Sequence, residues 1–192
     1  LNSEGEDFAS VEYYDANQAN IEEAKKLLAE AGYPNGEGLP TLEYMYNSEG
    51  AHKDVAQVIQ QDWAKIGVKV ELANQEWKVF LNTRQEGQYQ IARHGWLGDY
   101  VDPMTFLDLW VTGGGNNDAG YSNAEYDKLV AAAKVEQDAD KRWEMMKQAE
   151  DILMEDMPII PIYYYTQVKA ANKDVEGIRV SSLGHVYLYD AY

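Results

Sequence analysis

One stretch of the chain concentrates side chains that could bind a charged ligand. Arg93, His94 and Trp96 lie on a segment with strand character, and Asp99 and Tyr100 follow at its exit. The guanidinium could meet a carboxylate. The Asp99 carboxylate could hold an ammonium group through a charge-assisted hydrogen bond worth about 1.5–3 kcal/mol. Because ligands of α/β proteins usually bind where strands end, this stretch is the best candidate for a binding site.

Each of these residues also has a purely structural interpretation. Arg93 could pair with one of the many surface acids. Asp99 could cap a turn, but Asp102 stands directly before the proline that begins the next helix and suits that role better, which leaves Asp99 spare. Trp77 and Trp96 could line a side-chain pocket or pack in the core.

Hydrophobic periodicity predicts the elements that would position this stretch. Apolar residues at helical spacing indicate helices, with Asp15 as the cap of the first, and alternating apolar residues indicate strands. The expected order is helix, strand, helix, strand, helix, strand over residues 15–31, 41–47, 51–66, 68–72, 77–85 and 89–96. This alternation is typical of the α/β class, with crossover units that build one layer.

The second half of the chain predicts helices followed by a weaker pattern. A short helix should run from Pro103 through Trp110, and longer ones should begin after caps at Ser122 or Asn123 and at Asp138. Residues 159–167 predict a buried strand, near an edge or bulge because it contains a proline. Two short strand-like pieces follow.

Composition restricts the class of protein. The 192 residues suggest about one domain, and 45% hydrophobic residues are enough for a core. A net charge of −17 disfavours nucleic-acid binding. The absence of cysteine excludes disulfides, thiolate metal sites and a cysteine nucleophile. The acidic start does not resemble a signal peptide, so we expect an intracellular protein or a mature or excised piece of a longer one.

The motifs of common catalytic and metal sites do not match. The glycines at 113–115 lack the Lys-Ser/Thr of a phosphate loop, and residues 116–118 lack the spaced carboxylates of a calcium loop. The histidines, His52, His94 and His185, are scattered and form no metal pattern, and His52 by default caps or is exposed before its helix. A carboxylate-based glycoside hydrolase stays open as an alternative, because it needs only two acids facing one cleft.

Several motifs, in order along about residues 15–168, resemble the extracytoplasmic oligopeptide-binding proteins of ABC importers. They are EEAKKLLAEAGYP, EWKVFLNTR, HGWLGDYVDP, YSNAEYDKL and PIIPIYYYTQ. The resemblance implies a periplasmic-binding-protein-like type II lobe, a mixed sheet flanked by helices. It implies that residues 1–14 are a lead-in, that 15–168 form the second lobe without its first segments, and that 169–192 return to a first lobe that this chain lacks.

In that family an extended peptide lies between two lobes and pairs with strand segments, an arrangement with little side-chain selectivity. The resemblance places the peptide's α-ammonium on Asp99. It places backbone pairing on the strand end of Arg93, His94, Gly95, Trp96 and Leu97.

The other end of the peptide is placed by the same resemblance. Arg93 and His52 match positions that can help to neutralise the peptide's C-terminal carboxylate, and Trp77, Arg84 and Trp96 match positions that line side-chain pockets. The protein would have no catalytic residue, cofactor or metal. It would deliver peptides to the permease subunits of an ABC transporter outside the cytoplasm, in the periplasm or as a lipoprotein on the membrane's outer face. An oligosaccharide or a metal chelate is the alternative ligand.

Overall fold

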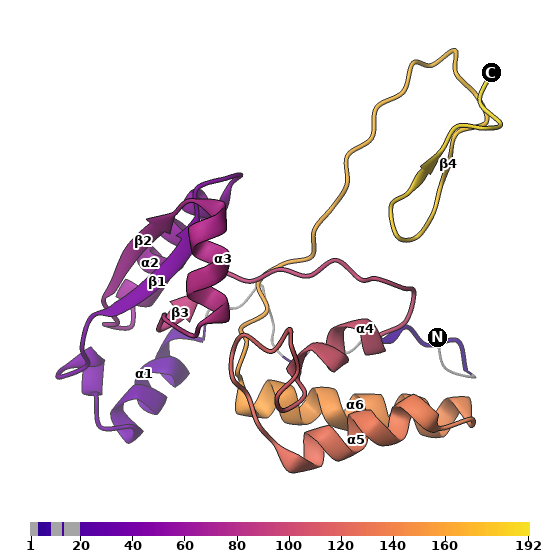
Figure 1. Cartoon of the computed structure of the whole chain (residues 1–192). Coiled ribbons are helices and arrows are strands. Elements are labelled where there is room, and N and C mark those ends of the chain that lie inside the picture. The colour runs from indigo at the N-terminus through magenta and orange to yellow at the C-terminus, as the bar shows by residue number, and fades with distance from the viewer. Residues whose placement is uncertain (1–3, 9–12, 14–19) are drawn as a thin grey trace. The chain divides into compact units, whose positions relative to one another are not determined.

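The computed structural model describes residues 4–8, 13 and 20–192, which divide into two compact units (Figure 1). The sheet unit comprises Glu12–Gly95, and the helical unit comprises Leu1–Val11 and Trp96–Tyr192. The expected cap Asp15 lies outside the described residues, as does most of the expected lead-in. The expected boundaries between lead-in, lobe and returning segment concern a larger protein and stay predictions.

A three-stranded parallel sheet organises the sheet unit. Its strands stand in the order β2-β1-β3, so the chain passes from β1 to β2 and then returns to the far side of β1. The elements are α1 (Ile21–Glu30), η2 (Pro34–Gly36), β1 (Leu42–Asn47), α2 (His52–Ala64), β2 (Val70–Gln75), α3 (Trp77–Gln85) and β3 (Ile91–Ala92).

Helices cover the central strand β1 on both faces, with α2 on one side and α3 on the other (Figure 1). Tyr44 and Tyr46 of β1 share a buried cluster with Ala56 of α2. Met45 alternates to the opposite face and is 1% exposed, and Phe80 of α3 is completely buried. The middle of the strand is therefore buried on both faces, as strands of parallel sheets usually are.

Strand ends differ from the sequence expectation, whereas most helix ends agree closely; the exception is α1, which begins at Ile21 rather than soon after Asp15. The β3 strand pairs only at Ile91 and Ala92, although a strand over 89–96 was expected, and β2 begins at Val70 and continues to Gln75. Among the described residues, β3 pairs with β1 alone. Its last bond runs from the Arg93 N–H to the Met45 carbonyl, 2.8 Å apart, so the chain beyond Arg93 leaves the sheet.

The helical unit is built around two packed helices. The expected caps are confirmed: the Asn123 side chain accepts backbone N–H groups at the start of α5, and the Asp138 side chain does so for α6. None of the helices in the described part of the chain is long and apolar enough to cross a membrane. The elements are α4 (Met104–Leu107), η3 (Asp108–Trp110), α5 (Ala124–Val135), α6 (Ala139–Asp156), β4 (Arg179–Val180) and β5 (Val186–Tyr187).

A buried tyrosine joins the short helix to the long ones. Tyr126 of α5 is completely buried, and its hydroxyl donates a hydrogen bond to the carbonyl of Leu107 at the end of α4. Burial is the main reason that the pKa of this hydroxyl is raised. Phe8, from the region expected to be a loose lead-in, contacts Trp143 of α6 edge-on at 5.0 Å.

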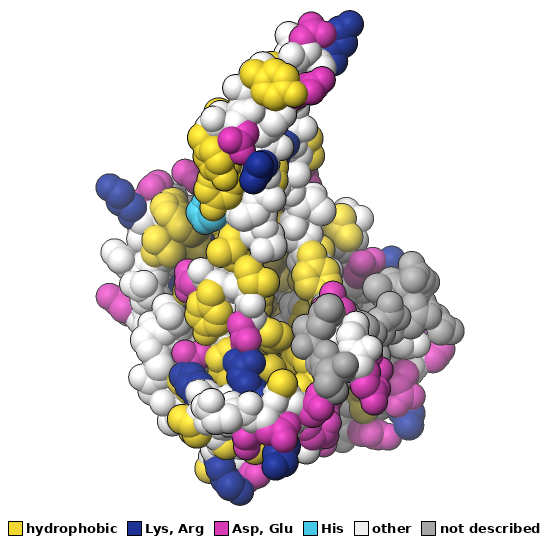
Figure 2. Space-filling view, turned by 90° about the vertical axis from the view of Figure 1, so that its right-hand side faces the viewer, with side chains coloured by type: hydrophobic (Ala, Val, Ile, Leu, Met, Phe, Trp, Pro, Cys, Tyr) yellow, Lys and Arg dark blue, Asp and Glu magenta, His cyan; other side chains and the backbone are white. Residues whose placement is uncertain are grey.

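The expected buried strand at 159–167 is wrong. No strand forms there, and the run is exposed, with Tyr164 at 85% exposure. A strand needs a ladder partner, and none of the described residues supplies one. Beyond it, β4 and β5 form a separate antiparallel hairpin. Hydrophobic side chains that stay at the surface are visible in Figure 2.

Replacing Tyr126 with phenylalanine should lower the free energy of unfolding by about 1–3 kcal/mol, because the Leu107 carbonyl loses its buried donor while ring packing is kept. Urea unfolding of the chain measures this. Tyr164→Phe is the matched control and should change stability by less than about 0.5 kcal/mol. Equal stability of the Tyr126→Phe and wild-type chains would contradict the assigned hydrogen bond.

Candidate functional site

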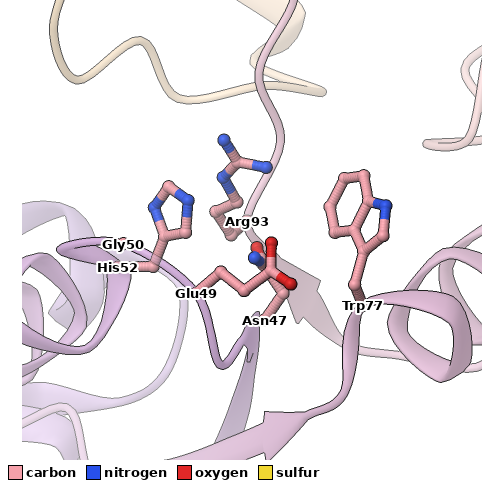
Figure 3. Close-up of a pocket in the computed structure, with 6 residues that line it drawn as sticks. All are labelled: Asn47, Glu49, Gly50, His52, Trp77 and Arg93. Atoms are coloured by element: carbon pink, nitrogen blue, oxygen red, sulfur yellow. The ribbon is translucent and has the colours of Figure 1, made fainter.

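A pocket of about 260 Å³ opens at the carboxyl ends of the parallel strands (Figure 3). Its walls come from the end of β1, the β1–α2 turn, the first residues of α2 and α3, and the residue after β3. The lining residues are Asn47, Glu49, Gly50, His52, Trp77 and Arg93.

The order of the strands explains why the pocket lies there. The connection that leaves β1 runs through α2 to β2 on one side, and the connection that leaves β2 runs through α3 back across β1 to β3 on the other side. Their divergence opens a crevice at the carboxyl end of β1, the switch point where α/β sheets usually bind ligands. The pocket thus lies where topology alone would place one.

Local capping and turn geometry bring two of the predicted residues into the pocket. The Glu76 side chain accepts the backbone N–H groups of Lys78 and Val79, which begins α3 at Trp77, immediately after β2. Gly50 has φ of +68°, a conformation that favours glycine, in the turn that leads to His52.

The pocket combines cationic and aromatic groups with hydrogen-bond acceptors. The side chains of His52, Arg93 and Trp77 project to the same side of the strand ends, and the Glu49 carboxylate lies between Arg93 and Trp77 (Figure 3). Burial, followed by the charge of Arg93, lowers the pKa of His52 below its ordinary 6.5. The unliganded imidazole is therefore mainly neutral at pH 7, and Arg93 supplies the positive charge.

Asn47 is a pocket residue that the sequence prediction missed. It is 3% exposed, and its Oδ1 has no hydrogen-bond partner within the described chain. Gln75, its register partner on β2, likewise has a buried Oε1 without a partner there. Such acceptors suit a ligand N–H or an ordered water. The signal that could have found Asn47 is a polar residue directly after the apolar run Tyr44–Tyr46, at the end of the strand. Glu49 and Gly50 were also missed.

The structure brings His52, Trp77 and Arg93 together, but it does not place the other predicted site residues in this pocket. The Arg84 guanidinium lies 5.5 Å from the ring centre of the buried Phe80, an interaction with the core. The remaining candidates in the sheet unit, His94 and Gly95, follow Arg93 outside any strand.

The other candidates, Trp96, Leu97 and Asp99, belong to the helical unit. Leu97 is 68% exposed, and Trp96 has a buried indole Nε1 without a partner among the described residues. Asp99 is exposed. Its backbone N–H donates to Thr105 Oγ1 at 3.1 Å, and within the described chain its carboxylate has no hydrogen bond or ion pair.

Comparison with curated proteins finds close relatives in several bacteria. The chain is 41% identical to the oligopeptide-binding protein OppA of Bacillus subtilis over 170 residues, which cover 88% of this chain and 31% of that protein. It is 38% identical to the periplasmic oligopeptide-binding protein OppA of Salmonella typhimurium over 179 residues, 92% of this chain and 33% of that protein. The chain spans about a third of the length of these relatives.

Solved structures confirm the α/β class and the type II periplasmic-binding-protein fold. The Haemophilus influenzae OppA in complex with RPPGFSPFR superposes with a TM-score of 0.77 at 37% identity, covering 90% of this chain and 34% of that one. The Escherichia coli murein tripeptide binding protein MppA gives 0.74 at 36% identity, covering 81% and 31%.

The model of the protein family described as "Bacterial extracellular solute-binding proteins, family 5 Middle" matches residues 4–118. This match extends over more than half of the chain, and the relatives named above are consistent with it. The resemblance noted from the sequence motifs is therefore confirmed, and the chain belongs to family 5 of the bacterial extracellular solute-binding proteins.

Proposed function

We propose that this chain forms one lobe of a two-lobed solute-binding protein that binds oligopeptides and delivers them to the permease of an ABC importer. The observation that carries the proposal is the pocket at the strand switch point, where Arg93, His52 and Trp77 meet. A cation beside a titratable imidazole suits a peptide carboxylate, and an indole offers an apolar wall to a side chain. The relatives are named for binding oligopeptides, which favours a peptide over an oligosaccharide or a metal chelate.

Asp99 is proposed as the anchor of the peptide's α-ammonium group. Its carboxylate is exposed and has no partner within the described chain, while its backbone is held by Thr105. The attraction between such a carboxylate and a ligand cation is strongest in a site that excludes water. The missing first lobe would supply that enclosure by closing over the ligand.

Backbone pairing with the peptide is proposed for the segment after β3. This strand stands at the edge of the sheet, and residues 94–97 belong to no ladder. An extended peptide could add to such an edge through main-chain hydrogen bonds. Arg84 and Trp96 would line side-chain pockets once the two lobes enclose the ligand.

The protein would act without catalysis, as a carrier whose mechanism is closure around the peptide. It would work outside the cytoplasm, in the periplasm or anchored as a lipoprotein, because the relatives include periplasmic binding proteins. The glycoside hydrolase alternative would need a pair of carboxylates about 5–9.5 Å apart across one cleft. The pocket has one carboxylate among its lining residues, Glu49.

Asp99→Asn in the intact protein should weaken binding of a peptide with a free amino terminus by about tenfold or more, because a charge-assisted bond becomes neutral. Isothermal titration calorimetry measures the affinity. The N-acetylated form of the same peptide is the control and should bind both proteins alike. Unchanged affinity for the free peptide would remove Asp99 from the site.

Affinity should depend on pH through His52. Burial and Arg93 keep the pKa of His52 low in the free protein, and a bound carboxylate should raise it by favouring the charged imidazolium. Binding should therefore strengthen as the pH falls through the bound-state pKa and level off below the free-state pKa. Titrations between about pH 5 and pH 8 test this.

The comparison that isolates His52 uses two changes. His52→Gln should flatten the dependence of affinity on pH, and so should a peptide whose carboxylate is amidated. A pH dependence that survives in the His52→Gln protein would show that another group is responsible.

A further inference from the structure

The turn that carries Asp99 has little regular structure of its own. Residues 99–103 precede the four-residue helix α4, and the Asp99 side chain has no anchoring partner within the described chain. Thr105 makes a contact with each of the two aspartates of the turn, Asp99 and Asp102. The Asp99 N–H donates to the hydroxyl of Thr105, which is 4% exposed, and the Thr105 N–H donates to the Asp102 carbonyl at 3.2 Å. The position of the Asp99 carboxylate therefore depends on where Asp102 is held.

Asp102 is held by an arginine from a distant part of the chain. Arg142 of α6 donates from Nη1 to Asp102 Oδ2 and from Nη2 to Asp102 Oδ1, both at 2.8 Å. Asp102 Oδ1 also accepts the backbone N–H of Met104 at 2.9 Å, which caps the first turn of α4. The hydrogen bonds from Arg142 are the main reason that the pKa of Asp102 is lowered.

The same guanidinium reaches a third segment. Arg142 Nε donates to the carbonyl of Ala133 near the end of α5 at 3.1 Å. One planar group thus ties the turn before α4 to both long helices. A lysine cannot reproduce this, because it has a single nitrogen and no fixed fork. The two side chains of the pair are 27% and 29% exposed, so this is a half-buried, bidentate contact.

A neighbouring pair on the same helix shows what an ordinary surface contact looks like. Lys141 Nζ lies 3.8 Å from Asp138 Oδ2, three residues earlier in the chain, and the two side chains are 69% and 49% exposed. Exposed pairs of this kind contribute little, whereas removing one partner of a half-buried pair leaves a charge without its counterion.

We propose that Arg142 is a positioning residue for ligand binding: through Asp102 it holds the turn that presents the Asp99 carboxylate to the peptide's ammonium group. The inference rests on the proposed role of Asp99. Arg142 does not touch the ligand in this arrangement. Its effect on affinity passes through the orientation of Asp99, because a binding group gains its full interaction only when its supporting contacts hold it in place.

The test is a double-mutant cycle in the intact two-lobed protein. Calorimetry measures the affinity of wild type, Arg142→Gln, Asp99→Asn and the double variant for one peptide, with its amino terminus free or acetylated. Arg142→Gln should weaken binding of the free peptide by about tenfold and leave the acetylated peptide within about twofold. In the Asp99→Asn background, Arg142→Gln should add less than about a twofold further loss.

Two further variants complete the design. Arg142→Lys keeps the charge but loses the fork and the bond to Ala133, so it should give a loss between those of wild type and Arg142→Gln. If Arg142→Gln does not fold, Arg142→Lys takes its place in the cycle. Lys141→Gln is the matched control on α6 and should bind both peptides as wild type does.

The outcomes separate this inference from the function on which it rests. If Asp99→Asn binds the free peptide normally, the proposed role of Asp99 fails and the inference fails with it. If Asp99→Asn weakens binding but the loss from Arg142→Gln is the same for both peptides and in both backgrounds, Asp99 keeps its role and the inference alone is overturned. The inference is supported if Arg142→Gln weakens binding only of the free peptide, and only in the protein that retains Asp99.

Discussion

The reversal of strand order at β1 is the constraint on which the rest of the proposed site depends. Because β2 and β3 lie on opposite sides of β1, the connections after the strands separate at its carboxyl end. Residues that are distant in sequence, such as His52, Trp77 and Arg93, reach one pocket for this reason. The packing of α2 and α3 against both faces of β1 holds the strand ends in place, so the core determines the shape of the pocket, and the buried Asn47 of β1 adds a polar group to it.

The helical unit differs from the sheet unit, because the binding residue that it positions lies on a turn rather than at a strand end. Few of the contacts there come from regular ladders. Instead, side chains from the long helices bond directly to the segment that contains α4: Tyr126 to the Leu107 carbonyl, and Arg142 to Asp102. Both bonds are shielded from solvent to some degree, which makes the loss of either partner costly. A binding residue on an irregular turn can be well placed when the supporting side chains are rigid.

The helices were largely predictable from sequence because their signals are local. Asn123 and Asp138 cap their helices as expected, and α3 has the bounds that its apolar spacing indicates. Strands were less predictable, because a strand exists only where a neighbour completes its ladder. That is why the expected strand at 89–96 shrinks to two residues and the one at 159–167 is absent from the described structure.

The candidate site shows the same division between local and distant information. Trp77 and the charged and aromatic residues around Arg93 stood out by type, and the family resemblance gave His52 a role at the ligand. Asn47 did not stand out, because its burial depends on the packing of β1 between two helices. The contact between Arg142 and Asp102 spans 40 positions, and no sequence periodicity indicates such a pair.

In the role proposed for this chain, Asp99 binds the ammonium group of a peptide, and Arg93 and His52 bind its terminal carboxylate. A crystal structure of the intact protein with a short bound peptide tests it most directly. We expect the peptide's ammonium group within hydrogen-bond distance of the Asp99 carboxylate and its terminal carboxylate beside Arg93 or His52. A peptide bound with Asp99 facing solvent and the pocket of Asn47 and Trp77 unoccupied would contradict it.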